Sequence, residues 1–181
     1  GIFITSATMI NYLQYAFAYE GGFFDFLSSS GLVMKDYIQA KMQLATLVGL
    51  ASYVLTIPYV YYGYEILVIH TACLLFSIGV IAPAILYMAT YNKKTMVLTK
   101  GSAFNYQGVG TMHFLVMLPV FIVPLMVFLP FKWMLSPEAG WLALAILGLL
   151  ALPFRKYFIQ AATGNLLKRK YIMAQGFREK N

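Results

Sequence analysis

Five long segments of this chain contain no aspartate, glutamate, lysine or arginine. A helix that crosses a bilayer needs about 20 mainly apolar residues, and most of these segments approach that length. Charged residues make up only 10% of the 181-residue chain and hydrophobic residues 61%, whereas soluble domains carry about 25% charged residues. We therefore predict an all-α polytopic membrane protein, with residues 1–181 forming a single transmembrane domain. The five predicted spans cover about 2–18, 42–62, 66–90, 113–130 and 140–154.

The distribution of basic residues orients these spans. With five spans, twelve of the 13 lysines and arginines fall in 19–41, 91–112 and 155–181, which would share one side, and only Lys132 falls on the other. Cytoplasmic loops hold the Lys/Arg excess, so we predict that these three segments and the C-terminus are cytoplasmic in a plasma or inner membrane. The basic tail then serves orientation and lipid contact, and without an accompanying motif we expect no nucleic-acid binding.

Prolines and glycines predict where the helices bend or end. An interior proline removes a backbone hydrogen bond, so we expect bends at Pro58 and Pro83 and an end to the fourth span at Pro130. The fifth span is short unless it continues as a helix into 155–162, and Gly164-Asn165 is expected to end that helix. The chain opens at Gly1 with an apolar run, and we expect it to be the C-terminal part of a longer protein.

The sequence lacks the motifs of common catalytic and nucleotide sites. It contains no GxxxxGK[ST], HExxH, GxSxG or CxxC, and its acids lie at or beyond the ends of the spans, which argues against a proton-coupled carrier. We therefore expect no catalytic residue, no cofactor and no metal site on this chain. A non-catalytic membrane anchor or assembly subunit remains an alternative. A membrane-embedded enzyme acting on lipids is a weaker one, because it would need clustered acids, histidines or a nucleophile.

Polar and small side chains inside the first two spans have two interpretations. Asn11 and Gln14 can hydrogen-bond to a neighbouring helix or sit at an interface, or they can line a substrate path. Ala45 and Gly49, four residues apart, form a small-xxx-small pair that lets helices approach closely. Helix packing is the first interpretation of this pair, and a dimer contact is the second.

The stretch Glu20–Lys41, EGGFFDFLSSSGLVMKDYIQAK, is the longest folded interruption between apolar segments. Its composition predicts a short amphipathic helix, a serine-rich turn and a new helix that begins at Met34 and runs into the second span. It is either a connector that lies on the membrane surface, with its phenylalanines in the headgroups, or a coupling helix that contacts a cytoplasmic partner. The candidate partner-binding residues are Glu20, Phe23, Phe24, Asp25, Phe26, Leu27 and Lys41.

This pattern of two acids, glycines, an apolar pair, a turn and a terminal lysine resembles the cytoplasmic segment of ABC-2-type transporter permeases. The tail LLKRKYIMAQGFRE and the loop AFNYQGVG are similar to an uncharacterised family of ABC-2-like permeases. In such permeases the segment links the second and third of six spans, so the resemblance implies one further span before Gly1. The sequence departs from the family at Gly31-Leu32-Val33, where the family usually has Pro or Asn followed by an Ile-Ser-like pair.

The resemblance also implies a function. The chain would be the transmembrane permease subunit of an ATP-driven exporter, embedded in the lipid bilayer as a dimer of permease units or as part of a longer chain. A separate cytoplasmic ATP-binding subunit would dock on residues 20–41 and hydrolyse the ATP, so this chain itself would not be an enzyme.

Overall fold

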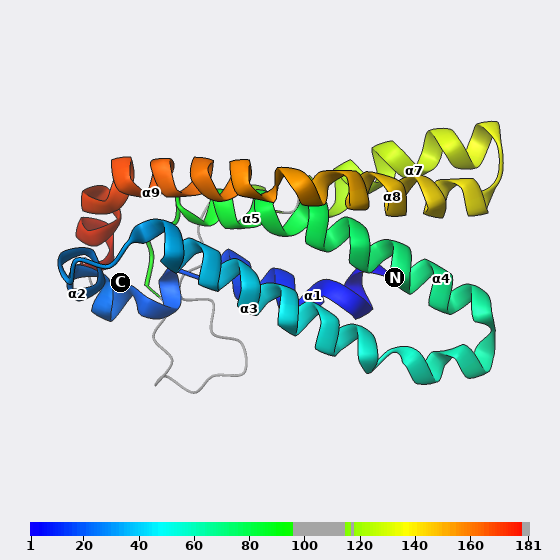
Figure 1. The fold of residues 1–181 in the computed structure, drawn as a ribbon, viewed down its shortest axis with the longest axis horizontal. Coiled ribbons are helices and arrows are strands. Elements are labelled where there is room, and N and C mark those ends of the chain that lie inside the picture. The colour runs from blue at the N-terminus through cyan, green and yellow to red at the C-terminus, as the bar shows by residue number, and fades with distance from the viewer. Residues whose placement is uncertain (96–114, 117, 179–181) are drawn as a thin grey trace.

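The computed structural model describes residues 1–95, 115–116 and 118–178, and within them it contains helices and no strands (Figure 1). This confirms the predicted all-α fold class. The predicted loop at 91–112 lies outside the described residues from position 96 onward. The elements are α1 (Ile2–Gln14), the 3₁₀ turn η1 (Ala18–Phe23), α2 (Phe24–Ser29), α3 (Met34–Val54), the 3₁₀ turn η2 (Ile57–Tyr62), α4 (Tyr64–Phe76), the π turn η3 (Ser77–Ile81), α5 (Ala82–Ala89), the π turn η4 (Leu118–Ile122), α7 (Val123–Met134), α8 (Pro137–Ala151), the 3₁₀ turn η5 (Leu152–Phe154) and α9 (Arg155–Arg178).

Two long helices run through most of the molecule. The first joins α4, η3 and α5 over the 26 residues Tyr64–Ala89, and the second joins α8, η5 and α9 over the 42 residues Pro137–Arg178. Within the described part of the chain, these are the two helices that are long and apolar enough to cross a membrane. The apolar helix Leu118–Met134 is shorter.

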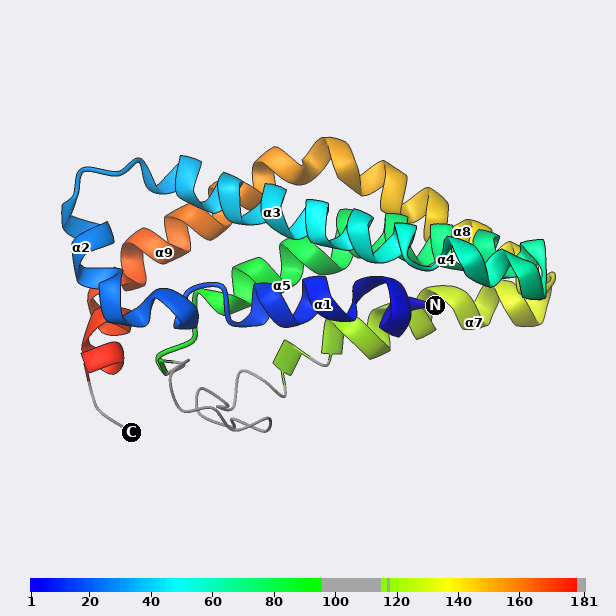
Figure 2. The ribbon, with the colours of Figure 1, turned by 90° about the horizontal axis from the view of Figure 1, so that it is seen from below.

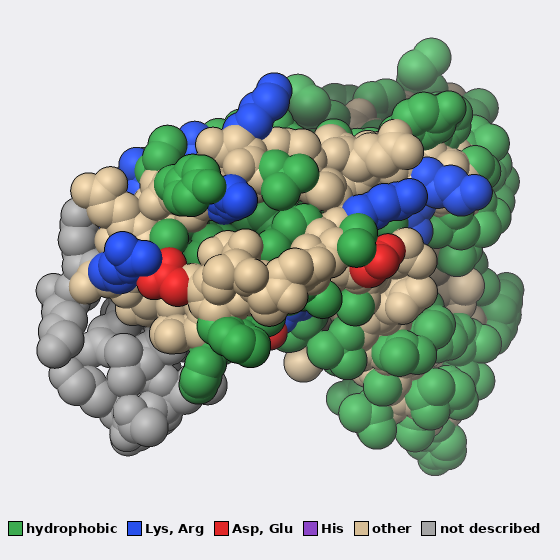
Figure 3. Space-filling model, turned by 60° about the vertical axis from the view of Figure 1, so that its left-hand side comes forward, with side chains coloured by type: hydrophobic (Ala, Val, Ile, Leu, Met, Phe, Trp, Pro, Cys, Tyr) green, Lys and Arg blue, Asp and Glu red, His purple; other side chains and the backbone are tan. Residues whose placement is uncertain are grey.

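The helices lie roughly along one axis, so the molecule is elongated (Figures 1 and 2). Its two ends carry different kinds of side chain. One end carries α2, residues 90–95 after α5 and the end of α9, and we call it the basic end, because lysines and arginines are spread across it in Figure 3. The other end carries η2 and the α7–α8 turn, and we call it the aromatic end. Its tyrosines and Trp133 are exposed, as in the aromatic belt of a membrane protein.

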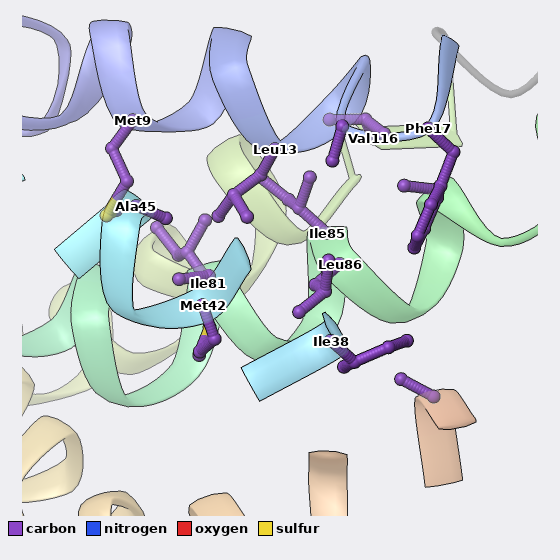
Figure 4. Packing of buried hydrophobic residues seen from close by; sticks show 14 of the residues in the cluster. Met9, Leu13, Phe17, Ile38, Met42, Ala45, Ile81, Ile85, Leu86 and Val116 are labelled. Carbon is purple, nitrogen blue, oxygen red and sulfur yellow. The ribbon is translucent and has the colours of Figure 1, made fainter. Parts of the chain in front are cut away.

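The core lies toward the basic end, where α1, α3 and the η3–α5 segment meet. Met9 and Leu13 of α1 point toward Met42 of α3 and toward Ile81 and Ile85, and all five are buried (Figure 4). Ala45 is fully buried in the same cluster, and a β-carbon on Gly49 would lie 3.1 Å from the sulfur of Met9. The small pair therefore serves packing of α3 against α1 within this chain.

The α7–α8 pair has a different surface. Leu125, Met126, Leu142 and Leu150 are exposed by between 51% and 71%. Exposed apolar patches on this scale are rare on soluble monomers and mark contact with a membrane or a partner.

The two long helices touch backbone to backbone. A β-carbon on Gly79 would overlap the carbonyl oxygen of Gly148, and a β-carbon on Gly148 would lie 2.5 Å from the carbonyl carbon of Leu75. Gly79 lies in η3 and Gly148 in α8. Because a side chain at either position would separate the helices, the crossing requires two glycines, as in small-residue contacts between membrane helices.

The structure corrects two predictions about prolines. The expected kink of the second span at Pro58 is wrong, because α3 ends at Val54 and Pro58 lies in the first turn of η2, where its missing N–H costs nothing. Pro130 does not end its helix, because α7 continues to Met134. Near Pro83 the helix stays continuous and accommodates the proline with the π turn η3 just before it.

The structure also corrects the expected end of the last helix. Gly164 and Asn165 lie inside α9, which continues to Arg178. The amide of Asn165 donates a hydrogen bond to the hydroxyl of Thr90 at the end of α5. Packing of α9 against α5 therefore outweighs the weak helix propensity of the Gly-Asn pair.

The glycine crossing predicts the effect of a single methyl group. Gly148→Ala should destabilise the protein by about 1–3 kcal/mol, because the added carbon overlaps the backbone of α4. The matched control is Gly164→Ala on the same long helix, where a β-carbon meets nothing within 4 Å. Thermal unfolding of the purified protein in detergent should show a lower Tm for the first variant and an unchanged or higher Tm for the second. Equal values would contradict the close crossing.

Candidate functional site

The candidate site is the segment between α1 and α3, residues 18–33, which we call the connector. It consists of η1, which contains two glycines, of α2, a helix of only six residues, and of the turn that follows α2. The hydroxyls of Ser28, Ser29 and Ser30 donate to carbonyls of the preceding turn at 2.9–3.0 Å. Gly31 follows with a φ of +74°, a value that favours glycine, and reverses the chain. The new helix begins at Met34, as the sequence predicts.

The first contact of the connector is made by Glu20. Its carboxylate accepts hydrogen bonds from the hydroxyl of Tyr37 and from the ammonium of Lys41. The two donors lie one turn apart on α3, so both reach the same acid. Lys41 is buried, with its side chain 10% exposed, whereas that of Glu20 is 34% exposed. The ammonium of Lys41 also lies 5.9 Å from the ring centroid of Tyr12 and 5.2 Å from that of Tyr37, a favourable cation–π arrangement.

The contacts among Glu20, Tyr37 and Lys41 also determine the protonation state of the tyrosine. Burial, and then the hydrogen bond to Glu20, raises the pKa of the Tyr37 hydroxyl, which therefore stays protonated and donates at neutral pH. A buried lysine without an acid would be strongly destabilising, so Glu20 and Lys41 stabilise each other. Both are sequence-predicted partner-binding residues, and the structure pairs them with each other.

The second contact joins the connector to the end of α9. Phe24 is buried, and its ring packs edge-on against Phe177 with centroids 5.2 Å apart. Next to it, the carboxylate of Asp25 accepts a hydrogen bond from Nε of Arg178 at 2.8 Å. This hydrogen bond lowers the pKa of Asp25, so its carboxylate stays ionised at neutral pH. Because both side chains of the ion pair are exposed, the aromatic contact carries most of the attachment.

The remaining candidate residues face outward. Phe23 is 72% exposed and Phe26 is 69% exposed, on either side of the buried Phe24. Leu27 is half-buried. The two phenylalanines are the most exposed apolar side chains of the connector, and Leu32 and Val33 after α2 are exposed as well.

The candidate path residues Asn11 and Gln14 lie together on α1. The amide of Gln14 donates to the side-chain oxygen of Asn11 at 3.4 Å, within one turn of the same helix. Asn11 is exposed and Gln14 half-buried. The bond is made within α1 and not between helices.

Sequence reasoning missed the role of Phe177 and Arg178. They lie 153 residues beyond their partners in the connector, and no local pattern links the two segments. The one available signal was topological, since both segments were predicted to share the cytoplasmic side. Among the described residues, no group of three or more His, Cys, Asp or Glu could hold a metal ion.

Fold and site together define a helical protein with two membrane-length helices and a connector that is fixed to α3 and to α9, the end of the second long helix. The model of a family of unknown function, DUF5687, matches residues 1–180, and the chain belongs to this family. No curated protein and no solved structure matches the chain.

The buried ion pair predicts a specific pattern of stabilities. Glu20→Gln should destabilise the protein by about 2 kcal/mol, because it leaves the Lys41 ammonium buried without an opposite charge. Adding Lys41→Met to this variant should restore part of the loss, because the unpaired charge is then removed. The control Glu65→Gln changes an acid in the first turn of α4 at the other end of the molecule. If both acid variants unfold at the same temperature in detergent, the pair does not hold the connector.

Proposed function

We propose that this chain is the transmembrane permease subunit of an ATP-driven, ABC-2-like exporter, and that the connector receives the movement of a separate ATP-binding subunit. One observation carries the proposal: the connector is fixed to α3 through Glu20 and to α9 through Phe24, while Phe23 and Phe26 remain exposed. A segment built this way transmits force, because pushing its exposed face moves two helices together.

The membrane location rests on the two long apolar helices and on the exposed apolar side chains of α7 and α8. The aromatic end lies outside in this proposal, and the bilayer extends inward to about Arg155. The segment 137–154 is then about 27 Å long, close to the thickness of a hydrocarbon core of about 30 Å. Beyond Arg155, α9 projects into the cytoplasm together with α5, the beginning of α3 and the connector. The proposal keeps five spans but shortens the third from the predicted 66–90, because α5 extends past Arg155 and Thr90 at its end is bonded to Asn165.

The mechanism follows from the two attachments. Closure of an ATP-binding subunit against Phe23 and Phe26 would displace α2 as a unit, since Phe24 is locked under Phe177. The Glu20–Lys41 pair would pass the same displacement to α3, whose outer half belongs to the membrane part. The long α8–η5–α9 helix would carry it to the α7–α8 pair. The energy comes from the partner, because this sequence has no phosphate-binding loop.

Topology can be tested with single cysteines in a Cys73→Ala background. A cysteine in place of Lys132 should react with a membrane-impermeant thiol reagent added to intact cells, and a cysteine in place of Lys94 should react only after the cells are opened. Both positions are exposed, so access depends on the side of the membrane and not on burial. The reverse labelling would overturn the proposed orientation.

Docking can be tested at the two exposed phenylalanines. Phe23→Asp combined with Phe26→Asp should abolish co-purification of a P-loop ATPase with the tagged chain, and substrate-stimulated ATP hydrolysis, while membrane insertion and Tm stay unchanged. The loss should be at least tenfold, because charges replace apolar contact at the interface. Tyr61→Asp, which changes a side chain 90% exposed at the aromatic end, is the control and should leave both readouts intact. A stable double variant with normal coupled hydrolysis would contradict the proposal, and a chain that never copurifies with an ATPase would favour the membrane-anchor alternative.

A further inference from the structure

A groove of about 500 Å³ lies between the first half of α3 and the junction of η5 with α9. On α3, its polar residues recur every four positions and therefore share one helix face. The opposite wall is formed by residues around the start of α9. The polar side chains that line the groove are Lys35, Gln39, Gln43, Arg155, Lys156 and Gln160.

The groove is basic. It gathers three cationic side chains, Lys35, Arg155 and Lys156, and among the described residues no acid lines it. Like charges that line one groove repel one another unless an anion or water screens them. The three glutamines add amide donors, which also suit an anion with several oxygens.

Arg155 adds an independent observation. Its Nη2 is buried and has no hydrogen-bond partner among the described residues. Leaving such a donor unpaired is destabilising, so a buried guanidinium nitrogen without a partner needs an explanation. Its planar fork matches the oxygens of a phosphate group, which would supply the missing acceptor.

The groove lies where the long helix changes direction. Pro153 lies in η5, and Figure 2 shows the bend between α8 and α9 at this point. A proline is a common cause of such a bend. Leu152 and Ile159 contribute apolar surface beside the cations. The site therefore combines basic and amide side chains with apolar surface on the side of η5 and α9, and it is larger than a phosphate group alone requires.

We propose that this groove binds a phosphate-bearing anion, with Arg155 holding the phosphate oxygens and Lys35 and Lys156 neutralising the charge. The phosphate belongs either to the headgroup of an anionic lipid or to a small soluble molecule. The groove residues are distinct from the connector, so the site does not depend on docking of an ATP-binding subunit.

The test uses the purified full chain in detergent and measures binding by native mass spectrometry and by the shift in Tm. One arm adds phosphatidylglycerol with phosphatidylcholine as the neutral lipid control, and the other adds inorganic phosphate with chloride as the control. Lys35→Gln combined with Lys156→Gln should weaken binding about tenfold or more, since each cation near the surface adds to the attraction of an anionic lipid. Both side chains are exposed, so this variant should remain folded. Adding Arg155→Gln to this double variant should weaken binding further.

The control is Lys168→Gln combined with Lys170→Gln, which removes the same charge from α9 outside the groove. If the groove variants lose phosphatidylglycerol binding and the control variant keeps it, the proposal is supported and the phosphate belongs to a lipid. If the same difference is seen with inorganic phosphate, the proposal is supported and the phosphate belongs to a small soluble molecule. Equal weakening in the control variant would show non-specific charge attraction, and that result, or no preference for either anion in the original protein, would overturn the proposal.

Discussion

The direct contact between the two long helices at Gly79 and Gly148 is the constraint on which the rest of the structure depends. Without side chains at these positions, the backbones meet and fix how far apart the two helices lie. The core around Met9 and Ile85 packs against one of these helices, and α7 packs against the other. Hydrophobic burial alone would not set this distance, because apolar side chains of many sizes fill a core almost equally well.

The connector depends on a different kind of interaction. Glu20 and Lys41 are both partly withdrawn from water, so each is costly without the other, and the position of η1 relative to α3 is fixed by charge. On its other side the connector is held by the ring contact of Phe24 with Phe177. Two attachments of different chemistry leave α2 little freedom to move alone. A six-residue helix in water would not be stable by itself, so these attachments also account for its being folded.

The sequence predicts part of this structure for clear physical reasons. Apolar periodicity and the lack of charge predict helices, and the Ser-Ser-Ser-Gly turn predicts the restart at Met34. At Pro58 the proline lies after the end of the helix and not inside it. The error at Gly164 has another cause, which is that local propensity was weighed without the neighbouring helices. The Asn165–Thr90 bond and the burial of Leu166 keep α9 helical where its sequence is weak. The partners of Asp25 and Phe24 lie far away in the chain, and the groove at Arg155 forms only when α3 and α9 cross, so neither site has a local signature.

The length of α9 has a consequence for how a partner would meet this protein. From Arg155 to Phe177 the helix rises about 33 Å, and the connector is attached at its far end. If the lipid headgroups lie near Arg155, the exposed phenylalanines stand about four Debye lengths away from them at physiological ionic strength. The surface charge of the membrane is screened almost completely over that distance. Recognition at the connector would then be insensitive to lipid composition, whereas the groove at Arg155 would respond to it directly.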